Sequence, residues 1–314
     1  MKLFDGGPLV SIVVITFNSA QFIVETLESA KNQSYQNIEL VISDDGSIDE
    51  TIKICNDWLN NNHARFVRFE LITSSHNTGI ACNLNRGIKA SKGEWIKSIA
   101  GDDILLPNCI SANMDYVNAN PEAVIVFSNM IHFTKEYTEN NYLTISDSLR
   151  KKLDKFFSLS TEKQLHIMIN CNYLPAPTVF QKRCIIESVG YYDEKYGYED
   201  WPMWISLLEK GIPLSYFDKN TIAYRHHVDG LSTHEGVLFN IKHQRWRYAI
   251  RKDLCFKHYS KLRQSVETSE YYVHEKIYAK GWHTDMYMHR ILYLTIIHWY
   301  SLLKLLIGSN PQSA

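Results

Sequence analysis

The 314-residue sequence predicts an α/β fold built on a mostly parallel sheet flanked by helices. Short β-branched runs alternate with amphipathic segments over the first hundred residues, which is the order of parallel strands joined by right-handed crossovers. Clusters of Asp and Gly directly follow several of these runs. With 45% hydrophobic and 21% charged residues, the composition is that of a folded globular protein. At about 150 residues per domain, the length allows one large domain with an appendage.

The first two strands each end in a polar loop. Residues 9–15 form an apolar, β-branched run that stops at Thr-Phe-Asn, and residues 19–32 carry apolar side chains at helical spacing. A second apolar run, 38–42, ends at Ser-Asp-Asp-Gly-Ser, and Asp49 starts the next predicted helix. Ligands of open parallel sheets bind beyond the carboxyl ends of the strands. We therefore expect a site at these loops.

The remaining elements continue this order. We expect a strand at 66–72, a helix at 81–90 and a strand at 95–100 that stops at Gly-Asp-Asp. A further strand is predicted at 124–128, and the polar segment 138–161 is either a loop or a locally helical insertion. A helix is predicted at 201–209, because Pro202 is tolerated in a first helical turn. The sequence after Gly236 is rich in aromatic and basic residues and favours long helices.

Three pairs of adjacent acidic residues are the strongest chemical signal: Asp44-Asp45, Asp102-Asp103 and Glu199-Asp200. Neighbouring carboxylates repel one another, so a cation or a sugar hydroxyl at the sheet edge would stabilise them. Helix capping is the alternative for a single Asp such as Asp44 or Asp49. No P-loop or GxGxxG pattern follows a strand. The pairs therefore favour a nucleotide diphosphate held through Mg²⁺ or Mn²⁺.

An ordered series of motifs runs along the chain: Ser11–Asn18, Asp44–Ser47, Asn77–Gly79, Asn85–Ile88, Gly93–Ile96, Ala100–Asp103, Gly190–Asp193, Glu199–Trp201 and Tyr224–His227 with Ser232. This series resembles the successive blocks of family 2 glycosyltransferases. The resemblance implies a GT-A fold, Rossmann-like with a C-terminal helical extension, a UDP-sugar donor, Mn²⁺ or Mg²⁺, and inversion at the anomeric carbon. It also implies transfer of one hexosyl or N-acetylhexosaminyl unit to a hydroxyl of a glycan acceptor, such as a polyprenyl-diphosphate-linked saccharide of bacterial surface polysaccharide (O-antigen, lipopolysaccharide or capsule).

The resemblance assigns roles to single residues. Asp200 matches the catalytic base, which takes the proton of the acceptor hydroxyl. Asp102 and Asp103 match the metal-binding DxD region, and the sequence leaves open which of them ligates the metal directly. Ala100 replaces a more usual Asp, and Leu84 replaces an Arg that is common in the family. The other implied roles are nucleotide-sugar binding by Thr16, Phe17, Asn18, Asp45 (to uracil), Asp102, Arg225 and His227, and acceptor contact by Glu199 and Trp201.

The histidines of the Tyr224–His227 block have two interpretations. His226 and His227 are either structural or in contact with the diphosphate, and His234 is expected at the surface.

The predicted domain plan is a catalytic domain, 1–236, followed by a helical region, 237–314. The first is expected to divide into a nucleotide-sugar half, about 1–130, and an acceptor half, about 131–236. Lys and Arg total 33 against 34 Asp and Glu, but from residue 241 onward the counts are 12 and 5. The net charge of −1 is thus the average of −8 before residue 241 and +7 after it.

The basic, aromatic C-terminal region favours peripheral contact with an anionic membrane over nucleic acid, with a helix packed on the catalytic domain as the alternative. Residues 291–307 are too interrupted by polar side chains for a confident membrane span. The N-terminus does not resemble a signal peptide, and six scattered cysteines indicate neither a disulfide framework nor a zinc site. A cytoplasmic location is therefore expected, at the inner face of the membrane if the region binds lipid.

Two other functions are compatible with parts of the sequence. A nucleotidyltransferase would need a glycine-rich, arginine-bearing loop after the first strand, and Thr16–Ser19 supplies none. A nucleotide-sugar-binding module without catalysis is compatible with Ala100, but the presence of Asp102, Asp103 and Asp200 argues against it.

Overall fold

The computed structural model describes residues 7–134, 137–138, 141–227, 241–280 and 287–307. The first half of its sheet is parallel throughout. Strands β1 (Val10–Thr16), β2 (Ile38–Asp44), β3 (Arg68–Thr73) and β4 (Trp95–Ala100) lie in the order β3-β2-β1-β4. Thr16 lies opposite Asp44, and Ile15 lies opposite Ala100. The loops after these strands therefore meet at one edge, as the sequence predicts.

The second half of the sheet is mixed. Strand β8 (Phe180–Lys182) pairs antiparallel with β4 on one side and with β6 (Ile125–Phe133) on the other. Strand β9 (Ser215–Arg225) runs parallel to β6, and the two short strands β5 (Ile104–Leu105) and β7 (Leu143–Thr144) pair antiparallel with β9 and β6. The predicted division near residue 130 falls inside β6, within this continuous sheet.

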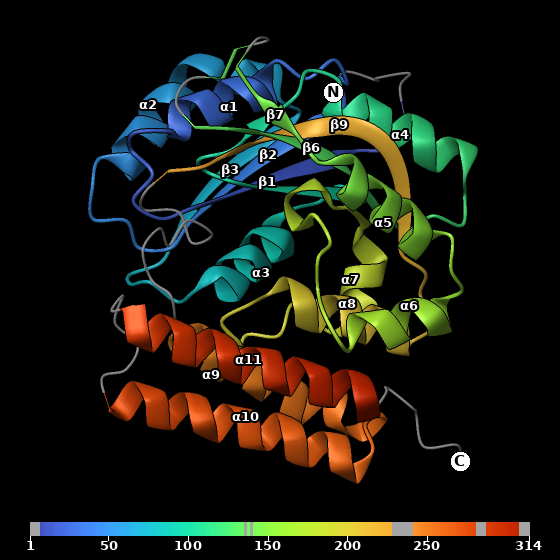
Figure 1. Cartoon of the computed structure of the whole chain (residues 1–314). Coiled ribbons are helices and arrows are strands. Elements are labelled where there is room, and N and C mark those ends of the chain that lie inside the picture. Colours follow the sequence, from blue (N-terminus) through green and yellow to red (C-terminus); the bar gives the residue numbers. More distant parts are fainter. Residues whose placement is uncertain (1–6, 135–136, 139–140, 228–240, 281–286, 308–314) are drawn as a thin grey trace.

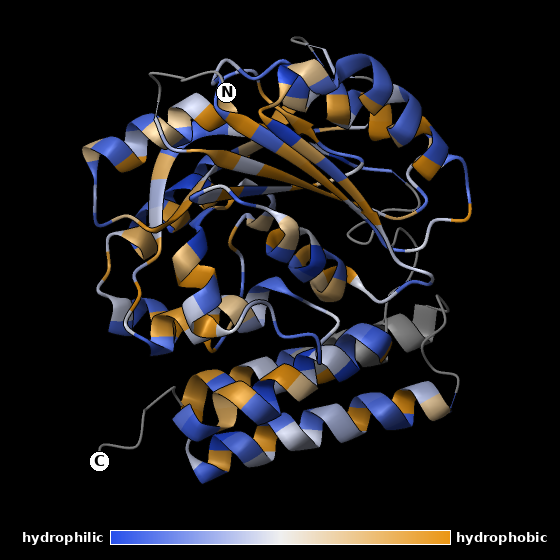
Figure 2. Ribbon diagram, turned by 180° about the vertical axis from the view of Figure 1, so that it is seen from behind, coloured by the Kyte–Doolittle hydropathy of each residue, from blue (hydrophilic) through white to orange (hydrophobic). Residues whose placement is uncertain are grey.

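Helices cover both faces of the sheet (Figure 1). One face is covered by α1 (Ile23–Lys31), α2 (Thr51–Asn62) and α4 (Cys109–Ala119). Since side chains alternate along a strand, Ile12 of β1 packs in the core with these helices, and Val13 packs on the other face. The central strands are accordingly mostly hydrophobic along their length (Figure 2). The second face is covered by α3 (Ile80–Ala90), α5 (Asp147–Phe157), α6 (Thr161–Met168), α7 (Arg183–Val189) and α8 (Asp200–Glu209).

The predicted insertion at 138–161 therefore contains a helix, α5, which Ser146 caps through its side chain. This outcome supports the helical alternative for that segment.

Three C-terminal helices form a further layer below α8 (Figure 1). They are α9 (Ile241–Ile250), α10 (Lys261–Ala279) and α11 (Tyr287–Ile307), with α10 packed against both others. Among the residues described, no helix has both the length and the hydropathy needed to cross a bilayer. The predicted boundary at 236/237, and with it Ser232 and His234, lies outside the described residues.

Candidate active site

The loops after β1 and β2 are tied together by hydrogen bonds. The backbone N–H of Asn18 donates to Ser47 Oγ (2.8 Å), and Asn18 Oδ1 accepts from the Ile48 N–H (2.9 Å). Asn18 adopts a left-handed conformation (φ 50°), which Asn tolerates better than most residues. Phe17, beside it, is 43% exposed. Asn18 therefore fixes the loop, while Phe17 presents its ring at the edge of the sheet.

Asp44 and Asp49 act as caps. Asp44 Oδ2 accepts from the backbone N–H groups of Gly46 (3.0 Å) and Ser47 (2.9 Å), and Asp49 Oδ1 accepts from Thr51 N–H at the start of α2 (3.0 Å). Gly46 has φ 78°, and a Cβ there would lie 2.7 Å from the His76 carbonyl carbon. Only glycine fits this turn.

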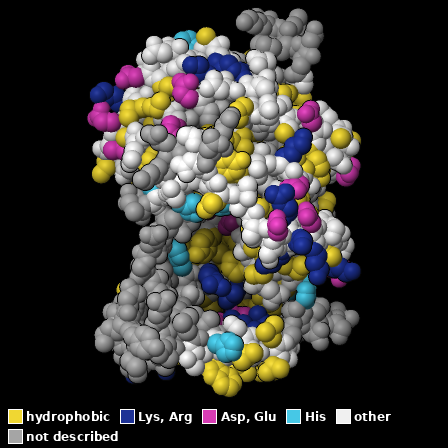
Figure 3. Space-filling model, turned by 45° about the horizontal axis from the view of Figure 1, so that its top comes forward, with side chains coloured by type: hydrophobic (Ala, Val, Ile, Leu, Met, Phe, Trp, Pro, Cys, Tyr) yellow, Lys and Arg dark blue, Asp and Glu magenta, His cyan; other side chains and the backbone are white. Residues whose placement is uncertain are grey.

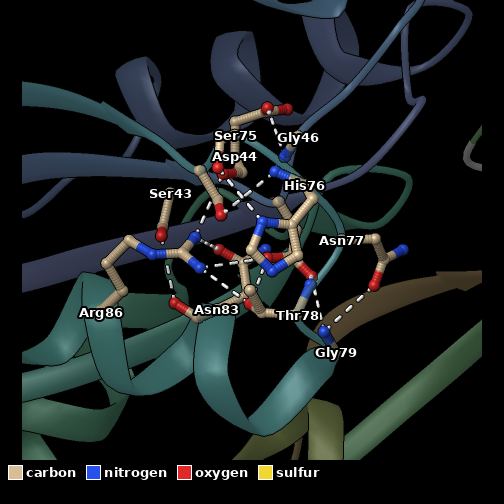
Figure 4. Close-up of polar contacts among 12 residues, drawn as sticks. Ser43, Asp44, Gly46, Ser75, His76, Asn77, Thr78, Gly79, Asn83 and Arg86 are labelled. Atoms are coloured by element: carbon tan, nitrogen blue, oxygen red, sulfur yellow. Dashed lines mark hydrogen bonds and ion pairs between the residues drawn. The ribbon is translucent and has the colours of Figure 1, made fainter.

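Asp45 is buried and receives four hydrogen bonds. The donors are the Thr78 N–H (2.8 Å) and Oγ1–H (2.5 Å), the Gly79 N–H (2.8 Å) and Arg86 Nη2 (3.1 Å). Arg86 also donates to the Asp44 carbonyl oxygen (3.1 Å), and its guanidinium points into this turn (Figure 4). Burial opposes ionisation of Asp45, but the bonds from Thr78 and Arg86 outweigh it and lower the pKa of this carboxyl. Asp45 is thus a carboxylate at the N-terminus of α3.

Asp102 and Asp103, between β4 and β5, face opposite environments. Asp102 Oδ2 lies 2.9 Å from His227 Nε2, and the Asp102 side chain is 29% exposed. Asp103 is buried, and its Oδ1 accepts from the Arg225 backbone N–H (2.9 Å). Burial and the neighbouring Asp102 raise the pKa of Asp103 well above its usual value. Of the pair, Asp102 is the carboxylate that is accessible to solvent.

Arg225 secures this arrangement from β9. Its guanidinium, with a side chain only 3% exposed, donates to Glu25 (2.6 Å) and to the Asp102 carbonyl oxygen (2.8 Å). It also lies over the rings of Phe22 (4.7 Å) and Phe133 (4.4 Å). This placement does not favour the diphosphate contact that the sequence predicts for Arg225, because its charge is turned into the protein.

Glu199 and Asp200 form a second acidic group at the start of α8. Asp200 Oδ1 accepts from the Trp201 N–H (2.7 Å), and Oδ2 accepts from Asn172 Nδ2 (2.6 Å). Burial raises the pKa of Asp200, and burial together with Asp200 raises the pKa of Glu199 to about 7. Trp201 is 5% exposed and donates to the Met168 carbonyl oxygen (2.8 Å). Its indole is therefore part of the core and does not offer a stacking surface to an acceptor.

A cavity of about 670 Å³ lies at the ends of β6 and β9, lined by residues that include His132, Tyr142, Thr144, Leu149 and His226. His226 is the neighbour of His227, and its Nε2 lies 2.9 Å from His132 Nδ1. Figure 3 shows a hollow in the surface between the part of the molecule that contains the sheet and the C-terminal helices. Basic and hydrophobic side chains line this hollow, and histidines lie at its rim.

Comparison with known proteins assigns the chain to a family. Residues 11–175 match the family model described as glycosyl transferase family 2, which is more than half of the chain. The chain belongs to glycosyltransferase family 2. This glycosyltransferase is 28% identical over 231 residues to UDP-Glc:α-D-GlcNAc-diphosphoundecaprenol β-1,3-glucosyltransferase WfaP of Escherichia coli, covering 72% of this chain and 81% of WfaP. It is 27% identical over 240 residues to the uncharacterized glycosyltransferase RT0329 of Rickettsia typhi, covering 76% and 70%.

Solved structures with the same fold confirm the predicted GT-A architecture. TarS 1–349 of S. aureus, in complex with UDP-GlcNAc, matches with a TM-score of 0.57 at 14% identity, over 94% of this chain and 81% of that one. The mannosyltransferase PcManGT of Pyrobaculum calidifontis, in complex with GDP-Man and Mn²⁺, matches with a TM-score of 0.56 at 16% identity, over 96% and 87%. At these identities the match supports the fold.

The predicted site residues of this glycosyltransferase fall into three places. Thr16, Asn18 and Asp45 meet at the ends of β1 and β2, and Asp102, Asp103, Arg225 and His227 meet at the ends of β4 and β9. Glu199, Asp200 and Trp201 form the third group at α8. Within the described residues, no cluster of three or more acidic, His or Cys side chains is arranged to hold a metal.

Sequence reasoning assigned no role to several residues that contact the candidate site residues. Arg86 binds Asp45 from a position two residues after Leu84, which is buried in the core. Asn85 donates to the Tyr192 carbonyl oxygen (2.8 Å) and to Glu194 (2.8 Å), so α3 links the Asp45 turn to the segment before Asp200. The Asn85-Arg86-Gly87 motif was the available signal. Asn172 lies in a polar loop, and no sequence motif indicated a role for it.

Proposed function

We propose that the protein transfers a single sugar from a UDP-sugar to a hydroxyl of a lipid-linked or other glycan acceptor in surface-polysaccharide assembly, with inversion and with the aid of a divalent metal. The observation that carries the proposal is the placement of Asp102 beside His227. These two residues lie at the same sheet edge as the loops that carry Phe17 and Asp45. The printed activity of the relative WfaP, a UDP-glucose-dependent transfer to a diphosphoundecaprenol-linked sugar, supports the donor and acceptor classes.

The nucleotide is proposed to bind at the ends of β1 and β2. Phe17 offers an exposed ring face on which a base can stack. Thr16 Oγ1 is buried without a hydrogen-bond partner among the described residues, and it lies 3.0 Å from the position of a Cβ on Gly101. A ligand hydroxyl would satisfy it. All four lone-pair positions of the Asp45 carboxylate are engaged, so uracil would have to displace one of the present donors.

The metal is proposed to bind between Asp102 and His227. A carboxylate oxygen and an imidazole nitrogen on facing side chains suit Mn²⁺ well, and Mg²⁺ would rely more on the carboxylate and the substrate phosphates. Asp103 fits less well, because it is buried and accepts from the Arg225 backbone. A metal bound there would supply positive charge to the departing diphosphate.

Asp200 is proposed as the catalytic base. A raised pKa makes its carboxylate a better proton acceptor near neutral pH, and the bonds from Trp201 and Asn172 fix its orientation. The acceptor hydroxyl loses its proton to Asp200 as its oxygen bonds to the anomeric carbon. The bond from that carbon to the diphosphate oxygen breaks on the opposite face, which inverts the configuration.

The acceptor is proposed to enter through the cavity beside His226. This cavity lies at the ends of β6 and β9, and His226 in its lining is the chain neighbour of His227, which lies beside Asp102. Tyr142 and Thr144 in its lining are the kind of side chains that stack on and hydrogen-bond sugars. Of the acceptor residues that the sequence suggests, Glu199 remains a candidate for orienting the hydroxyl, whereas the buried Trp201 does not.

We also propose a cytoplasmic location with peripheral membrane contact through α11. Trp299, Leu305 and Leu306 are exposed on this helix, the two leucines at 78% and 83%. A net charge of +7 from residue 241 onward would attract anionic headgroups.

The test is a screen of nucleotide sugars with Mn²⁺, measuring slow hydrolysis of the donor without an acceptor. We expect one UDP-sugar to be preferred, and Asp200→Asn to lower turnover by about 10²–10⁴-fold while UDP binding is retained. Binding of UDP-sugars without hydrolysis or transfer would instead support a binding module. Turnover of a nucleoside triphosphate with a sugar phosphate would support a nucleotidyltransferase.

A further inference from the structure

The C-terminal helix α9 touches the loop that carries Glu199 and Asp200. A Cβ on Gly197 would lie 1.9 Å from Cε2 and 2.1 Å from Cδ2 of Trp246. The indole therefore occupies the space that any other side chain at position 197 would need. Position 197 therefore requires glycine because there is no room for a larger side chain beside the indole.

Aromatic contacts extend this interface. The ring of Tyr198 meets Trp246 edge to face, with centroids 5.6 Å apart, and lies 5.6 Å from His243. His243 in turn stacks on Trp246 at 5.5 Å. The loop thus rests on a small aromatic cluster from α9.

Polar and cationic contacts hold the two ends of the loop. Asp253, in the turn Arg251–Cys255 that follows α9, accepts from Lys195 Nζ (2.6 Å) and from the Tyr196 hydroxyl (3.1 Å). At the other end, the Arg251 guanidinium lies 5.8 Å from the ring centroid of Trp201. Five of the seven residues 195–201 therefore contact α9 or this turn, and the remaining two are Glu199 and Asp200.

We propose that α9 is part of the catalytic apparatus: Trp246, seated against Gly197 and Tyr198, positions the loop so that Asp200 meets the acceptor hydroxyl. The inference rests on the proposed role of Asp200 as the base. Trp246 is a positioning residue, because it acts through the loop and not on the substrate. The C-terminal region would then be required for turnover, whatever its contact with membranes.

The groups around Glu199 and Asp200 allow the role of Trp246 to be tested through the pH dependence of turnover. Tyr192, from the segment after α7, and Tyr198, from the loop itself, interact electrostatically with the acidic pair. Arg247 of α9 interacts with Tyr198, and Arg251 lies over the ring of Trp201. Loosening the loop would admit water to Glu199 and Asp200 and lower their pKa values toward those of ordinary carboxyl groups. Turnover would then persist to lower pH.

The test is a double-mutant cycle on the full chain, with turnover of the preferred UDP-sugar measured as hydrolysis. We expect Gly197→Ala and Trp246→Ala each to lower kcat by about 10- to 100-fold, the cost of a misplaced catalytic group, with KM for the donor nearly unchanged. The double variant should be no worse than Trp246→Ala, because that change removes the atoms that the new methyl group would strike. Additive losses would overturn the proposal, and so would an unchanged kcat in either single variant.

Three further variants separate positioning from general destabilisation. Trp246→Phe should restore most of the turnover, and Phe69→Ala, which removes an exposed aromatic ring on β3, should leave it unchanged. The acidic midpoint of the pH–rate profile should move down in Trp246→Ala and stay in place in Phe69→Ala. If Trp246→Ala does not fold, Trp246→Leu replaces it in the cycle. Full activity in Asp200→Asn would remove the base assignment, but the Gly197–Trp246 coupling would still be measurable.

Discussion

Adjacent carboxylates in this protein serve different purposes because their side chains point in opposite directions. Asp44 caps a turn while Asp45 binds Thr78 and Arg86, and Asp103 accepts a backbone bond while Asp102 faces His227. The chemistry of each pair therefore depends on the direction in which each of its two carboxylates points.

Removing Asp102 or His227 should weaken metal-dependent nucleotide binding. We expect Asp102→Ala and His227→Ala to raise the Kd for UDP in the presence of Mn²⁺ by about tenfold or more, that is by at least about 1.4 kcal/mol. Binding without Mn²⁺ should change little. Isothermal titration calorimetry with and without the metal checks this. Asp103→Asn, which keeps a hydrogen-bond acceptor for Arg225, is the matched control, and an equal loss in that variant would contradict the assignment.

The pH dependence of turnover should report the Glu199–Asp200 pair. The pKa values of both carboxyls are raised, that of Glu199 to about 7, and a base must be ionised to act. We therefore expect kcat to fall toward acid with a midpoint above the usual carboxyl range, because burial raises the pKa of Asp200. Glu199→Gln should move this midpoint down, since it removes the charge beside Asp200. An unchanged midpoint in stopped assays between pH 5 and 9 would show that another group controls the rate.

Sequence reasoning predicted that the acidic motifs follow the strands, but it did not predict the orientation of their side chains. A sequence motif shows only that two acidic residues follow a strand. Which of them is buried depends on β9, from which Arg225 reaches across 122 residues to Asp103. The sequence does not show that Arg86 contacts Asp45, because this contact depends on the helical geometry of α3, which directs residue 86 to the Asp45 turn while Leu84 is buried in the core.

At the scale of elements, the alternating first half of the sheet was predictable and the second half was less so. Strand β9 was not predicted, because Asp218, Lys219 and Asn220 interrupt its apolar pattern. The structure accommodates them where the register with β6 shifts, near Phe127 to Met130. Helices α4 and α6 were not predicted. Their apolar faces are short, and the spacing of apolar residues alone does not distinguish such segments from strands or loops.

The C-terminal helices are joined by a buried ionic cluster. Glu267 of α10 pairs with Arg251 (3.0 Å), Arg263 (2.9 Å) and Lys304 of α11 (3.0 Å). Burial disfavours its charge, but the three cations outweigh burial and lower the pKa of Glu267. Its contribution to stability is therefore present at neutral pH and is lost as the pH falls through that lowered value.

Neutralising Glu267 should destabilise this layer. We expect Glu267→Gln to lower the free energy of unfolding by about 3–5 kcal/mol, the usual cost of breaking a buried ion pair. Urea unfolding measures the change. Glu275→Gln breaks the exposed pair with Arg245 and should cost at most about 1 kcal/mol. Similar values for both variants would mean that the cluster contributes little.

For the whole molecule, charge is divided between two parts: −8 before residue 241 and +7 after it. The sequence alone left membrane contact and packing on the catalytic domain as alternatives for the basic part. The structure packs α9 on the loop of Asp200 while α11 keeps exposed leucines, so one region can serve both purposes.

Vesicle binding should depend on both charge and apolar area. We expect the protein to co-sediment with phosphatidylglycerol vesicles at low salt and to be released near 0.5 M NaCl, where the Debye length is only about 4 Å. Leu305→Ser with Leu306→Ser should weaken binding, whereas Val67→Ser, at an exposed position before β3, should not. Equal binding to neutral vesicles would contradict the electrostatic part of the proposal.

Strand β8 has a mechanical consequence. It is only three residues long, and in the described chain it is the strand that joins the parallel β3-β2-β1-β4 half to the β6-β9 half. A few ladder bonds, with those from buried Lys97 to the Pro177 and Val179 carbonyl oxygens, hold this seam. Amide protons along the seam should exchange before those of β1 and β2. The two halves of the sheet are therefore joined at β8 by fewer backbone hydrogen bonds than join the strands within each half.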